Sequence, residues 1–308
     1  MTSGVGNRPE IARALRFIAD HLDEALSVAE VARAARLSEF HFHRLFHAEV
    51  GEPVGRFVTR RRLELSALRL AYERDRTVTD IALSSGYSST SNFSKAFTKY
   101  FGASPTEVRE GRGSSESLGR LTAQYGKQFR PSDLYVVPPA MSDDERRARA
   151  ATCNVRMEDF PGLELACMAG PGGYGLETLE PLWQALIGRC VQLGICGEEV
   201  DAWGIAFDSP TVTAPELCRY HACIPCEAER TLAPPLFRAS MPAGRYAVFS
   251  YEGSVAGIDD AFRTIYSCWF PLSSLSPEDL TPYQRYVGNE PKDGRVELEV
   301  WLKTRPRR

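Results

Sequence analysis

The sequence SVAEVARAARLSEFHFHRLF at residues 27–46 repeats its pattern in TVTDIALSSGYSSTSNFSKAF at residues 77–97. Each copy opens with a hydroxyl residue, Ser27 or Thr77, three positions before an acidic residue. This spacing is that of a capping box, in which hydroxyl and acid satisfy backbone amides at a helix start. Two short helices joined by a turn, with alanine at the crossing, form a helix-turn-helix. The sequence therefore predicts two such motifs, about fifty residues apart.

Arg36 and Gly86 occupy the turns of the two motifs, and the second helices begin at Ser38 and at Ser88 or Ser89. A turn of this kind often carries glycine, because the left-handed backbone conformation costs other residues about 1–2 kcal/mol. We expect packing to absorb that cost at Arg36. The residues predicted to face the core from the second helices are two phenylalanine pairs, Phe42 with Phe46 and Phe93 with Phe97.

Residues 53–72 between the motifs predict one helix, because their apolar residues recur at roughly helical spacing. About twenty residues at about 1.5 Å each span roughly 30 Å. This length is close to the roughly 34 Å repeat of DNA, so one chain can place two recognition helices in successive major grooves. The apolar residues of this helix are Phe57, Leu63, Leu65, Leu68 and Leu70.

Residues 26–109 resemble the AraC/XylS family of transcription regulators without a gap. The most specific strings are VTDIALSSGY at 78–87, SNFSKAF at 91–97 and KYFGASPTEVR at 99–109. The resemblance implies a transcription regulator that binds double-stranded DNA and has RNA polymerase as a partner. It leaves open whether the protein activates or represses.

The resemblance also indicates which positions face DNA. In the first recognition helix, Arg44 is suited to a bidentate contact with guanine and His43 to a single hydrogen bond. The matching residues of the second helix are short and neutral except for Lys95, so that helix is expected to position the protein more than to read bases. A solvated helix face is the alternative interpretation of both sets. The full sets are Ser38, Phe40, His43 and Arg44, and Thr90, Ser91, Ser94 and Lys95.

The net charge of −3 does not by itself suggest a nucleic-acid partner. Residues 1–112, however, hold 17 basic and 14 acidic residues, against 20 and 26 in the rest of the chain. The prediction of DNA binding therefore depends on local basic groups that can neutralise phosphates and make the affinity fall with salt. The groups we expect to do so are Arg60, Arg61, Arg62, Lys95 and Lys99.

A length of 308 residues suggests two domains, each large enough for its own core. We predict a double helix-turn-helix domain over residues 1–112, which includes an amphipathic helix over 10–26. A linker follows over 113–152, and a second domain covers 153–308. Within the linker, residues 134–137 look like a strand and residues 142–148 look like the charged start of a helix.

A second repeat occupies the second domain. The string FPGLELA at 160–166 corresponds to MPAGRYA at 241–247, and each is followed by a glycine bend and an amphipathic helix, over about 179–193 and 258–269. Each copy ends in two further strands, at 202–207 with 217–224 and at 283–287 with 296–302. The predicted fold class is therefore an all-α DNA-binding domain followed by an α+β pseudo-twofold domain, with a cleft between its halves.

This second domain resembles the GyrI-like effector-binding domain over residues 154–306. The matching phrases include IAFDSP at 205–210, RYHACI at 219–224 and FSYEG at 249–253. The resemblance implies a small, aromatic or lipophilic effector. Candidate walls of its binding site are aromatic residues, any one of which is equally suited to a core: Tyr174, Trp183, Phe207, Tyr251, Trp269, Tyr283, Tyr286 and Trp301.

Gln284 lies where relatives of the GyrI-like type usually carry a glutamate that meets cationic ligands. A buried carboxylate favours a lipophilic cation, whereas an amide removes that preference. We therefore expect neutral or polar aromatic ligands to bind better than cations. Two other acids, Glu299 and Glu252, are alternative sources of a carboxylate for the site.

Cys218, His221, Cys223 and Cys226 invite a test as a metal or redox site. Cys223 and Cys226 have the spacing of a zinc pair, but a second pair is missing from the sequence. On a strand, Cys218 would face away from His221 and Cys223, which splits the ligand set. We therefore predict core or surface thiols, with no metal and no cofactor.

No Ser-His-Asp or Cys-His pairing with an orienting group stands out in residues 154–306, so the chain is predicted not to be an enzyme. The alternative is a hydrolase or scavenger of reactive small molecules fused to a DNA-binding domain, because some GyrI-like relatives are implicated in such chemistry. No apolar run reaches the length of a membrane span, and the first nine residues lack a signal-peptide layout. We expect a cytoplasmic protein.

Overall fold

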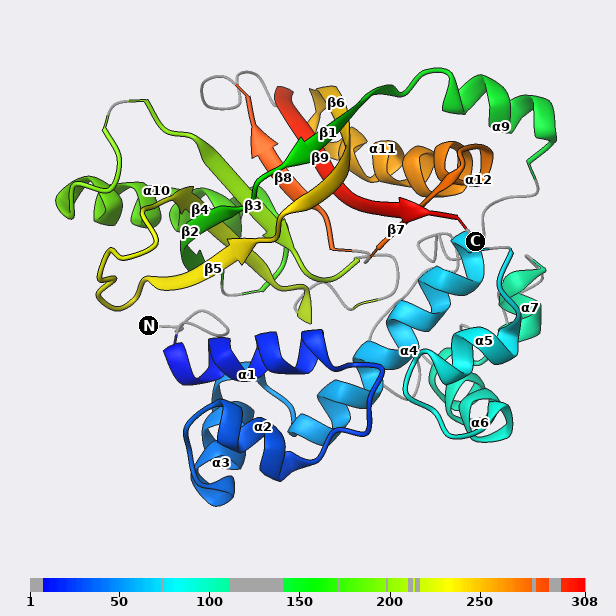
Figure 1. Cartoon of the computed structure of the whole chain (residues 1–308), viewed down its shortest axis with the longest axis horizontal. Coiled ribbons are helices and arrows are strands. Elements are labelled where there is room, and N and C mark those ends of the chain that lie inside the picture. The colour runs from blue at the N-terminus through cyan, green and yellow to red at the C-terminus, as the bar shows by residue number, and fades with distance from the viewer. Residues whose placement is uncertain are drawn as a thin grey trace. The chain divides into compact units, whose positions relative to one another are not determined.

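The computed structural model describes residues 8–73, 75–110, 141–170, 172–197, 199–209, 213, 217–278, 281–287 and 295–307. These residues form two compact units, one built from residues between 13 and 147 and the other from residues from 148 onward together with 8–12 (Figure 1). The first unit is helical and the second contains an antiparallel sheet, as the predicted fold class requires. The exact domain limits at 112 and 152 remain a prediction.

The helices of the first unit follow one another through short turns. Both capping boxes are present: the Ser27 hydroxyl accepts from the Glu30 amide, and the Thr77 hydroxyl accepts from the Asp80 amide. The hydroxyls donate in turn to the acids, and these hydrogen bonds lower the pKa of Glu30 and of Asp80. The helices are α1 (Pro9–Asp20), α2 (Val28–Ala34), α3 (Glu39–Val50), α4 (Val54–Tyr72), α5 (Val78–Leu83), α6 (Thr90–Phe101) and α7 (Pro105–Arg109).

The turns of the two motifs have the predicted left-handed backbone, with φ of 61° at Arg36 and 75° at Gly86. The second helices begin after Ser38 and Ser89, whose hydroxyls accept from the third amide of α3 and α6. The helix predicted over 53–72 is observed as α4, with Leu65 only partly buried on its apolar side. Both phenylalanine pairs are completely buried, which confirms the faces assigned to α3 and α6.

The predicted linker lies mostly outside the described residues, and so does the strand-like run at 134–137. Its last part contains helix α9 (Asp143–Ala150), which begins where the charged pattern indicated. The Ser142 hydroxyl accepts from the Glu145 amide at 3.2 Å, and the Glu145 carboxylate accepts from the Ser142 amide at 2.8 Å. Arg149 at the other end of α9 pairs with Asp260 at 3.2 Å.

The second unit is built on one antiparallel sheet with the order β1-β6-β9-β8-β3-β4-β2-β5. This order contains two equivalent halves, β5-β2-β4-β3 and β1-β6-β9-β8, which meet where β3 pairs with β8. It confirms the predicted pseudo-twofold repeat. The outer strand β1 pairs with β6 of the second copy, and the outer strand β5 pairs with β2 of the first copy. The strands are β1 (Asn154–Phe160), β2 (Leu163–Ala169), β3 (Ala202–Ala206), β4 (Tyr220–Pro225), β5 (Phe237–Met241), β6 (Gly244–Ser254), β7 (Leu275–Pro277), β8 (Tyr283–Tyr286) and β9 (Arg295–Pro306). The short strand β7 lies outside this order and pairs with β9.

Helices cover one face of this sheet, which we call the helix-covered face (Figure 1). Helix α10 (Leu176–Gln192) packs there on β2 and β4 through Leu182 and Leu186. The second helical segment packs on Phe249 of β6 through Trp269 and Phe270. It consists of η3 (Val255–Gly257), α11 (Ile258–Thr264), the π-helical η4 (Ile265–Trp269) and α12 (Phe270–Leu272).

The pairing register shows that both helical segments lie on the same face. Directly opposed residues of neighbouring strands point to the same side of a sheet. Phe249 opposes Val300, Val300 opposes Gln284, Gln284 opposes Gly204, and Gly204 opposes Ala222 under α10. The opposite face carries a second apolar cluster that includes Trp203 and Trp301.

Candidate DNA-binding and ligand-binding sites

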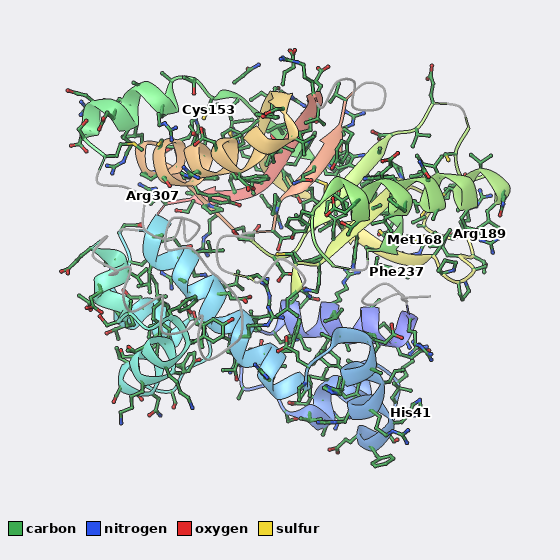
Figure 2. The ribbon with its side chains drawn as sticks, turned by 180° about the vertical axis from the view of Figure 1, so that it is seen from behind. His41, Cys153, Met168, Arg189, Phe237 and Arg307 are labelled. Carbon is green, nitrogen blue, oxygen red and sulfur yellow. The ribbon has the colours of Figure 1, made fainter. Side chains whose placement is uncertain are left out.

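Helix α3 buries one side and exposes the residues predicted to contact DNA. Phe40, His43 and Arg44 are all exposed, and so is the capping residue Ser38. His41, also exposed, lies at the surface of this helix in Figure 2. The exposed fraction of Phe40 is 75%, which is unusual for a phenylalanine in a folded domain.

Arg44 lies with its guanidinium 5.8 Å from the centre of the Phe40 ring. This cation–π contact holds two groups suited to base edges on the same turn of α3. A guanidinium can donate two hydrogen bonds to guanine, and an aromatic ring can contact the methyl group of thymine. The exposed face of α3 therefore has the chemistry of base readout.

Helix α6 presents a smaller and more neutral surface. Ser91 and Lys95 are exposed, whereas Thr90 and Ser94 are half-buried. The Thr90 hydroxyl donates to the Thr79 hydroxyl of α5 at 3.4 Å, so Thr90 is hydrogen-bonded within its own motif. The exposed basic groups are Lys95 and, one turn later, Lys99.

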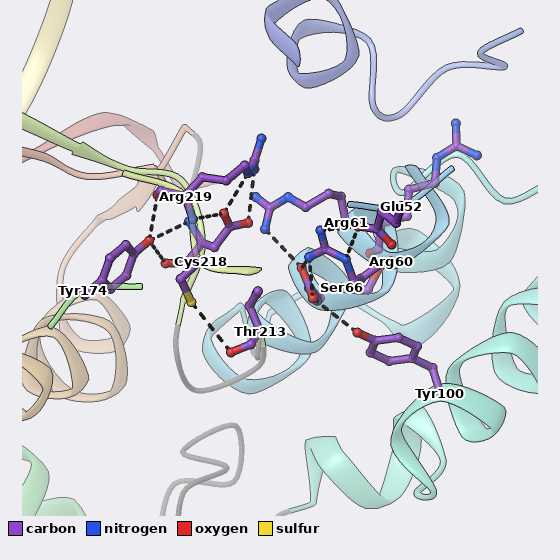
Figure 3. A network of polar contacts seen from close by, with 12 residues as sticks. Glu52, Arg60, Arg61, Ser66, Tyr100, Tyr174, Thr213, Cys218 and Arg219 are labelled. Carbon is purple, nitrogen blue, oxygen red and sulfur yellow. Dashed lines mark hydrogen bonds and ion pairs between the residues drawn. The ribbon is translucent and has the colours of Figure 1, made fainter. Parts of the chain in front are cut away.

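The prediction that Arg60 and Arg61 neutralise phosphates is wrong. Both are buried on α4 and are paired with the fully buried carboxylate of Glu64, Arg60 at 3.0 Å and Arg61 at 3.2 Å (Figure 3). Arg60 also contacts Glu52 after α3 at 2.6 Å, and the Tyr100 hydroxyl of α6 donates to Glu64 at 3.3 Å. The local sequence showed three consecutive arginines but not which partner each of them would meet in the fold.

Arg62, the third of these arginines, is also bound within the protein. Its Nε donates to the carbonyl of Leu22 at 2.8 Å, and its Nη2 donates to the carbonyl of Glu24. Its Nη1 donates to the carbonyl of Gly86 at 3.4 Å. A guanidinium engaged with three backbone carbonyls is a structural group, so the phosphate role predicted for Arg62 is wrong as well.

The structure distributes the predicted ligand residues over both faces of the sheet. Phe207, Glu299 and Trp301 belong to the opposite face, where Phe207 and Trp301 join the tryptophan cluster. The register places Gln284, Tyr286 and Tyr251 on the helix-covered face. Three further predicted residues lie on that side: Tyr174, Trp183 and Trp269.

Trp183 and Tyr286 are two predicted aromatic residues that the fold brings into ring contact on the helix-covered face. The two rings are 5.4 Å apart in an edge-on arrangement. Trp269 instead packs on Phe249 of β6, two strands away from Tyr286. The hydroxyl of Tyr251 donates to the carbonyl of Ser254, at the end of its own strand.

Tyr220 completes this group and was missed by sequence reasoning. Its ring is 6.4 Å from Trp183 and 6.0 Å from Tyr174, and its hydroxyl shares a hydrogen bond of 2.8 Å with that of Tyr286. The Tyr286 hydroxyl in turn lies 3.5 Å from the amide oxygen of Gln284. Burial raises the pKa of Tyr220 and of Tyr286, so both phenols stay neutral.

Gly204 is the local signal that could have pointed to Tyr220. It lies on β3 opposite Gln284, and the Tyr220 ring crosses directly over it. A Cβ at this position would overlap the Tyr220 hydroxyl and would lie 2.5 Å from Cζ. Glycine inside a strand often marks such a close approach.

The two acids proposed as alternative carboxylates do not reach Gln284. The direct neighbour of Gln284 on β9 is Val300, so Glu299 points to the opposite face. There the Glu299 carboxylate binds Arg156 at 2.7 Å and accepts from the Trp301 indole at 3.0 Å. Glu252 is exposed, lies on the same opposite face, and pairs with Arg295 at 3.3 Å.

The cysteine group does not converge on one point. His221 lies between the rings of Phe207 and Phe237, and burial lowers its pKa to about 3. The Cys223 thiol donates to the carbonyl of His221 at 3.6 Å, and the Cys218 thiol donates to the carbonyl of Thr213 at 3.7 Å. In the part of the chain that the structure describes, three or more His, Cys, Asp or Glu side chains do not gather as a metal site.

None of the helices in the described residues is long and apolar enough to cross a membrane.

Two family matches cover the two parts of the chain. Residues 31–111 match a helix-turn-helix domain, and residues 154–305 match the GyrI-like small molecule binding domain. Over 278 residues the chain is 23% identical to the transcriptional regulator Rob of Salmonella typhimurium, covering 90% of this chain and 89% of that protein. It is 22% identical over 295 residues to the right origin-binding protein of Escherichia coli, covering 93% and 95%.

The chain is also similar to a solved structure. The C-terminal domain of AraT, a response regulator from Geobacillus stearothermophilus, is 30% identical and matches 35% of this chain and 90% of that one, with a TM-score of 0.33. With both domains matched in order along the chain, this protein belongs to the AraC/XylS family of DNA-binding transcription regulators and is ligand-responsive, with a GyrI-like small-molecule-binding domain as its C-terminal part.

Proposed function

We propose that one molecule of this protein binds an asymmetric DNA site by placing α3 and α6 in two successive major grooves. The observation that carries the proposal is the pair of capped motifs joined by α4, whose 19 residues span about 28 Å. That length approaches one turn of DNA, about 34 Å. We propose α3 as the helix that reads bases and α6 as the helix that positions the protein on phosphates.

Arg44→Ala is expected to weaken specific DNA binding by about 1–3 kcal/mol and to relax the preference at one base pair. The reason is that Arg44 is exposed beside Phe40, and a guanidinium can donate two hydrogen bonds to guanine. Fluorescence anisotropy with the selected site and with every single base change in it measures both effects.

Arg56→Ala is the matched control for this experiment, since Arg56 is an arginine of α4 whose side chain is 64% exposed. We expect it to leave the base preference unchanged. Equal losses of affinity by Arg44→Ala on the selected site and on random DNA would show that Arg44 contacts only phosphates.

For the effector we propose a neutral aromatic molecule that binds beside Trp183 and hydrogen-bonds to Gln284 and Tyr286. The preference for a neutral ligand is supported by the placement of the acids. Glu299 and Glu252, the two alternative carboxylates suggested by the sequence, lie on the other face of the sheet. Gln284 therefore meets the Tyr286 phenol, which is itself hydrogen-bonded to that of Tyr220, and neither of these two carboxylates. An amide has donors and an acceptor for a polar ligand but no charge to attract a cation.

Gln284→Glu is expected to shift the preference from neutral toward cationic aromatic ligands, because a buried carboxylate is stabilised by a positive partner. The shift is measured by isothermal titration calorimetry with two matched ligands, a neutral aromatic amine and its quaternary ammonium derivative. Each ligand is titrated into the wild type and into Gln284→Glu. Glu299→Gln is the control and should leave the preference unchanged, since that carboxylate is on the opposite face. A wild type that already prefers the cation would contradict the proposal.

We also propose that the C-terminal domain senses its ligand without converting it. His221, the only histidine after residue 47, has a pKa lowered to about 3 by burial, far from the range of a useful general base. Incubation of the protein with each bound ligand, followed by chromatography, tests this point. Accumulation of a hydrolysis product would favour a hydrolase or scavenger instead.

A further inference from the structure

Arg62 connects the turn that leads into the first helix-turn-helix motif with the turn of the second motif through a single side chain. It lies on α4, where its guanidinium donates to the carbonyls of Leu22, Glu24 and Gly86. Leu22 and Glu24 belong to the turn between α1 and α2, which leads into the first motif. Gly86 is the turn residue of the second motif. We call these four residues the Arg62 clamp.

Gly86 fits this clamp in two ways. Its φ of 75° is in the region that favours glycine, and its missing side chain leaves room for the guanidinium. A Cβ on Gly86 would lie 2.7 Å from Cζ of Arg62 and 2.8 Å from Nη2. A side chain at residue 86 would therefore displace the Arg62 guanidinium from the second turn.

The second motif also accepts two other hydrogen bonds from α4, and neither of these involves the first motif. The Ser66 hydroxyl donates to that of Ser85 at 2.9 Å, and Arg69 donates to the carbonyl of Ser84 at 3.1 Å. Arg62 differs because the same planar group contacts the turn before the first motif and the turn of the second motif. Its rigid fork of donors fixes the direction of each bond, which a lysine ammonium does not do.

From this geometry we propose that Arg62 is a positioning residue that sets the spacing of the two DNA half-sites, by fixing the second motif relative to the first. This inference rests on the proposed binding of α3 and α6 to successive grooves. A rigid connection means that only half-sites about one helical turn apart are reached without strain. A loosened connection widens the range of spacings and lowers the affinity at the preferred one.

The experiment compares wild type with Arg62→Gln and Arg62→Lys on a series of DNA duplexes. Each duplex carries both half-sites, obtained by selection with the wild-type protein, at the selected spacing or at spacings one and two base pairs shorter or longer. Duplexes with only one half-site complete the series. Anisotropy gives the affinities, and circular dichroism confirms that each variant is folded at the temperature used.

We expect the Arg62 variants to lose about tenfold in affinity at the selected spacing, to show a flatter dependence on spacing, and to bind single half-sites within about twofold of wild type. Arg69→Gln, which leaves the bonds of Arg62 in place, should keep the wild-type spacing profile. An equal loss at all spacings and on single half-sites would show that Arg62 only stabilises the fold and would overturn the inference.

Gly86→Ala tests the same clamp without changing Arg62, because its Cβ would displace the guanidinium. Gly51→Ala is its control: Gly51 has a similar φ of 83°, and a Cβ there has no neighbour within 4 Å. We expect a flattened spacing profile for Gly86→Ala alone. A wild type that tolerates every spacing equally would instead contradict the proposed binding to two grooves, and the inference would fail with it.

Discussion

Glu64→Gln is expected to lower the free energy of unfolding of the helical unit by about 3–5 kcal/mol, the usual cost of removing one partner from a buried ion pair. Glu64 is fully buried and accepts from Arg60, from Arg61 and from the Tyr100 hydroxyl. Glutamine keeps the shape of the side chain but leaves two buried guanidinium groups without this carboxylate. Urea denaturation followed by circular dichroism measures the change.

The same substitution should also weaken DNA binding, because the network links α4 to Tyr100 of α6. Arg56→Ala is the control, since Arg56 is exposed and its Nε lies 3.9 Å from the Glu52 carboxylate, a long distance for an ion pair. A long ion pair whose arginine is exposed to solvent contributes about 0–1 kcal/mol. A Glu64→Gln variant as stable as Arg56→Ala would show that the two buried arginines, Arg60 and Arg61, do not depend on Glu64.

Gly204→Ala is expected to abolish ligand binding by the C-terminal domain while the helical unit keeps its affinity for DNA. The added methyl group would overlap the Tyr220 hydroxyl, which must then leave its hydrogen bond with Tyr286. Forcing extra volume into a packed interior costs about 1–3 kcal/mol in stability. Calorimetric titration with the ligand, and DNA binding in its absence, separate the two effects.

Gly188→Ala is the matched control for this substitution in the same domain. Gly188 lies within α10, and a Cβ there has no neighbour within 4 Å, so alanine should stabilise the helix by about 0.5–1 kcal/mol. In a Tyr220→Leu background, Gly204→Ala should cost much less stability than in wild type, because the two sites are in contact. Additive costs would mean that Tyr220 is not the group that the methyl displaces.

Several features of this protein could be predicted from the sequence because they depend on contacts a few residues apart. The hydroxyl of Ser27 or Thr77 reaches an amide three positions later in any helix start, so the capping boxes were readable without the fold. The phenylalanine pairs of α3 and α6 recur at the helical repeat, which fixes them on one side. The internal repeat of the C-terminal domain was also visible as similar strings, whereas the order in which its strands pair came from the structure.

The partners of Arg60, Arg61 and Arg62 could not be predicted from the sequence. Three consecutive arginines on a helix point in three directions, and composition alone favours solvent or phosphate as their partner. Only the fold brings Glu52, Tyr100 and the carbonyl of Gly86 to them from distant parts of the chain.

The ligand residues show the same limit in a sheet. The sequence determined two motifs, two repeats and the glutamine at position 284, because these are properties of residue type and local spacing. The tertiary structure decided that Glu299 and Gln284 lie on opposite faces and that Tyr220 joins Tyr286. The physical reason is strand register, since a shift of one residue exchanges the two faces of a strand and register is set by pairing between distant segments.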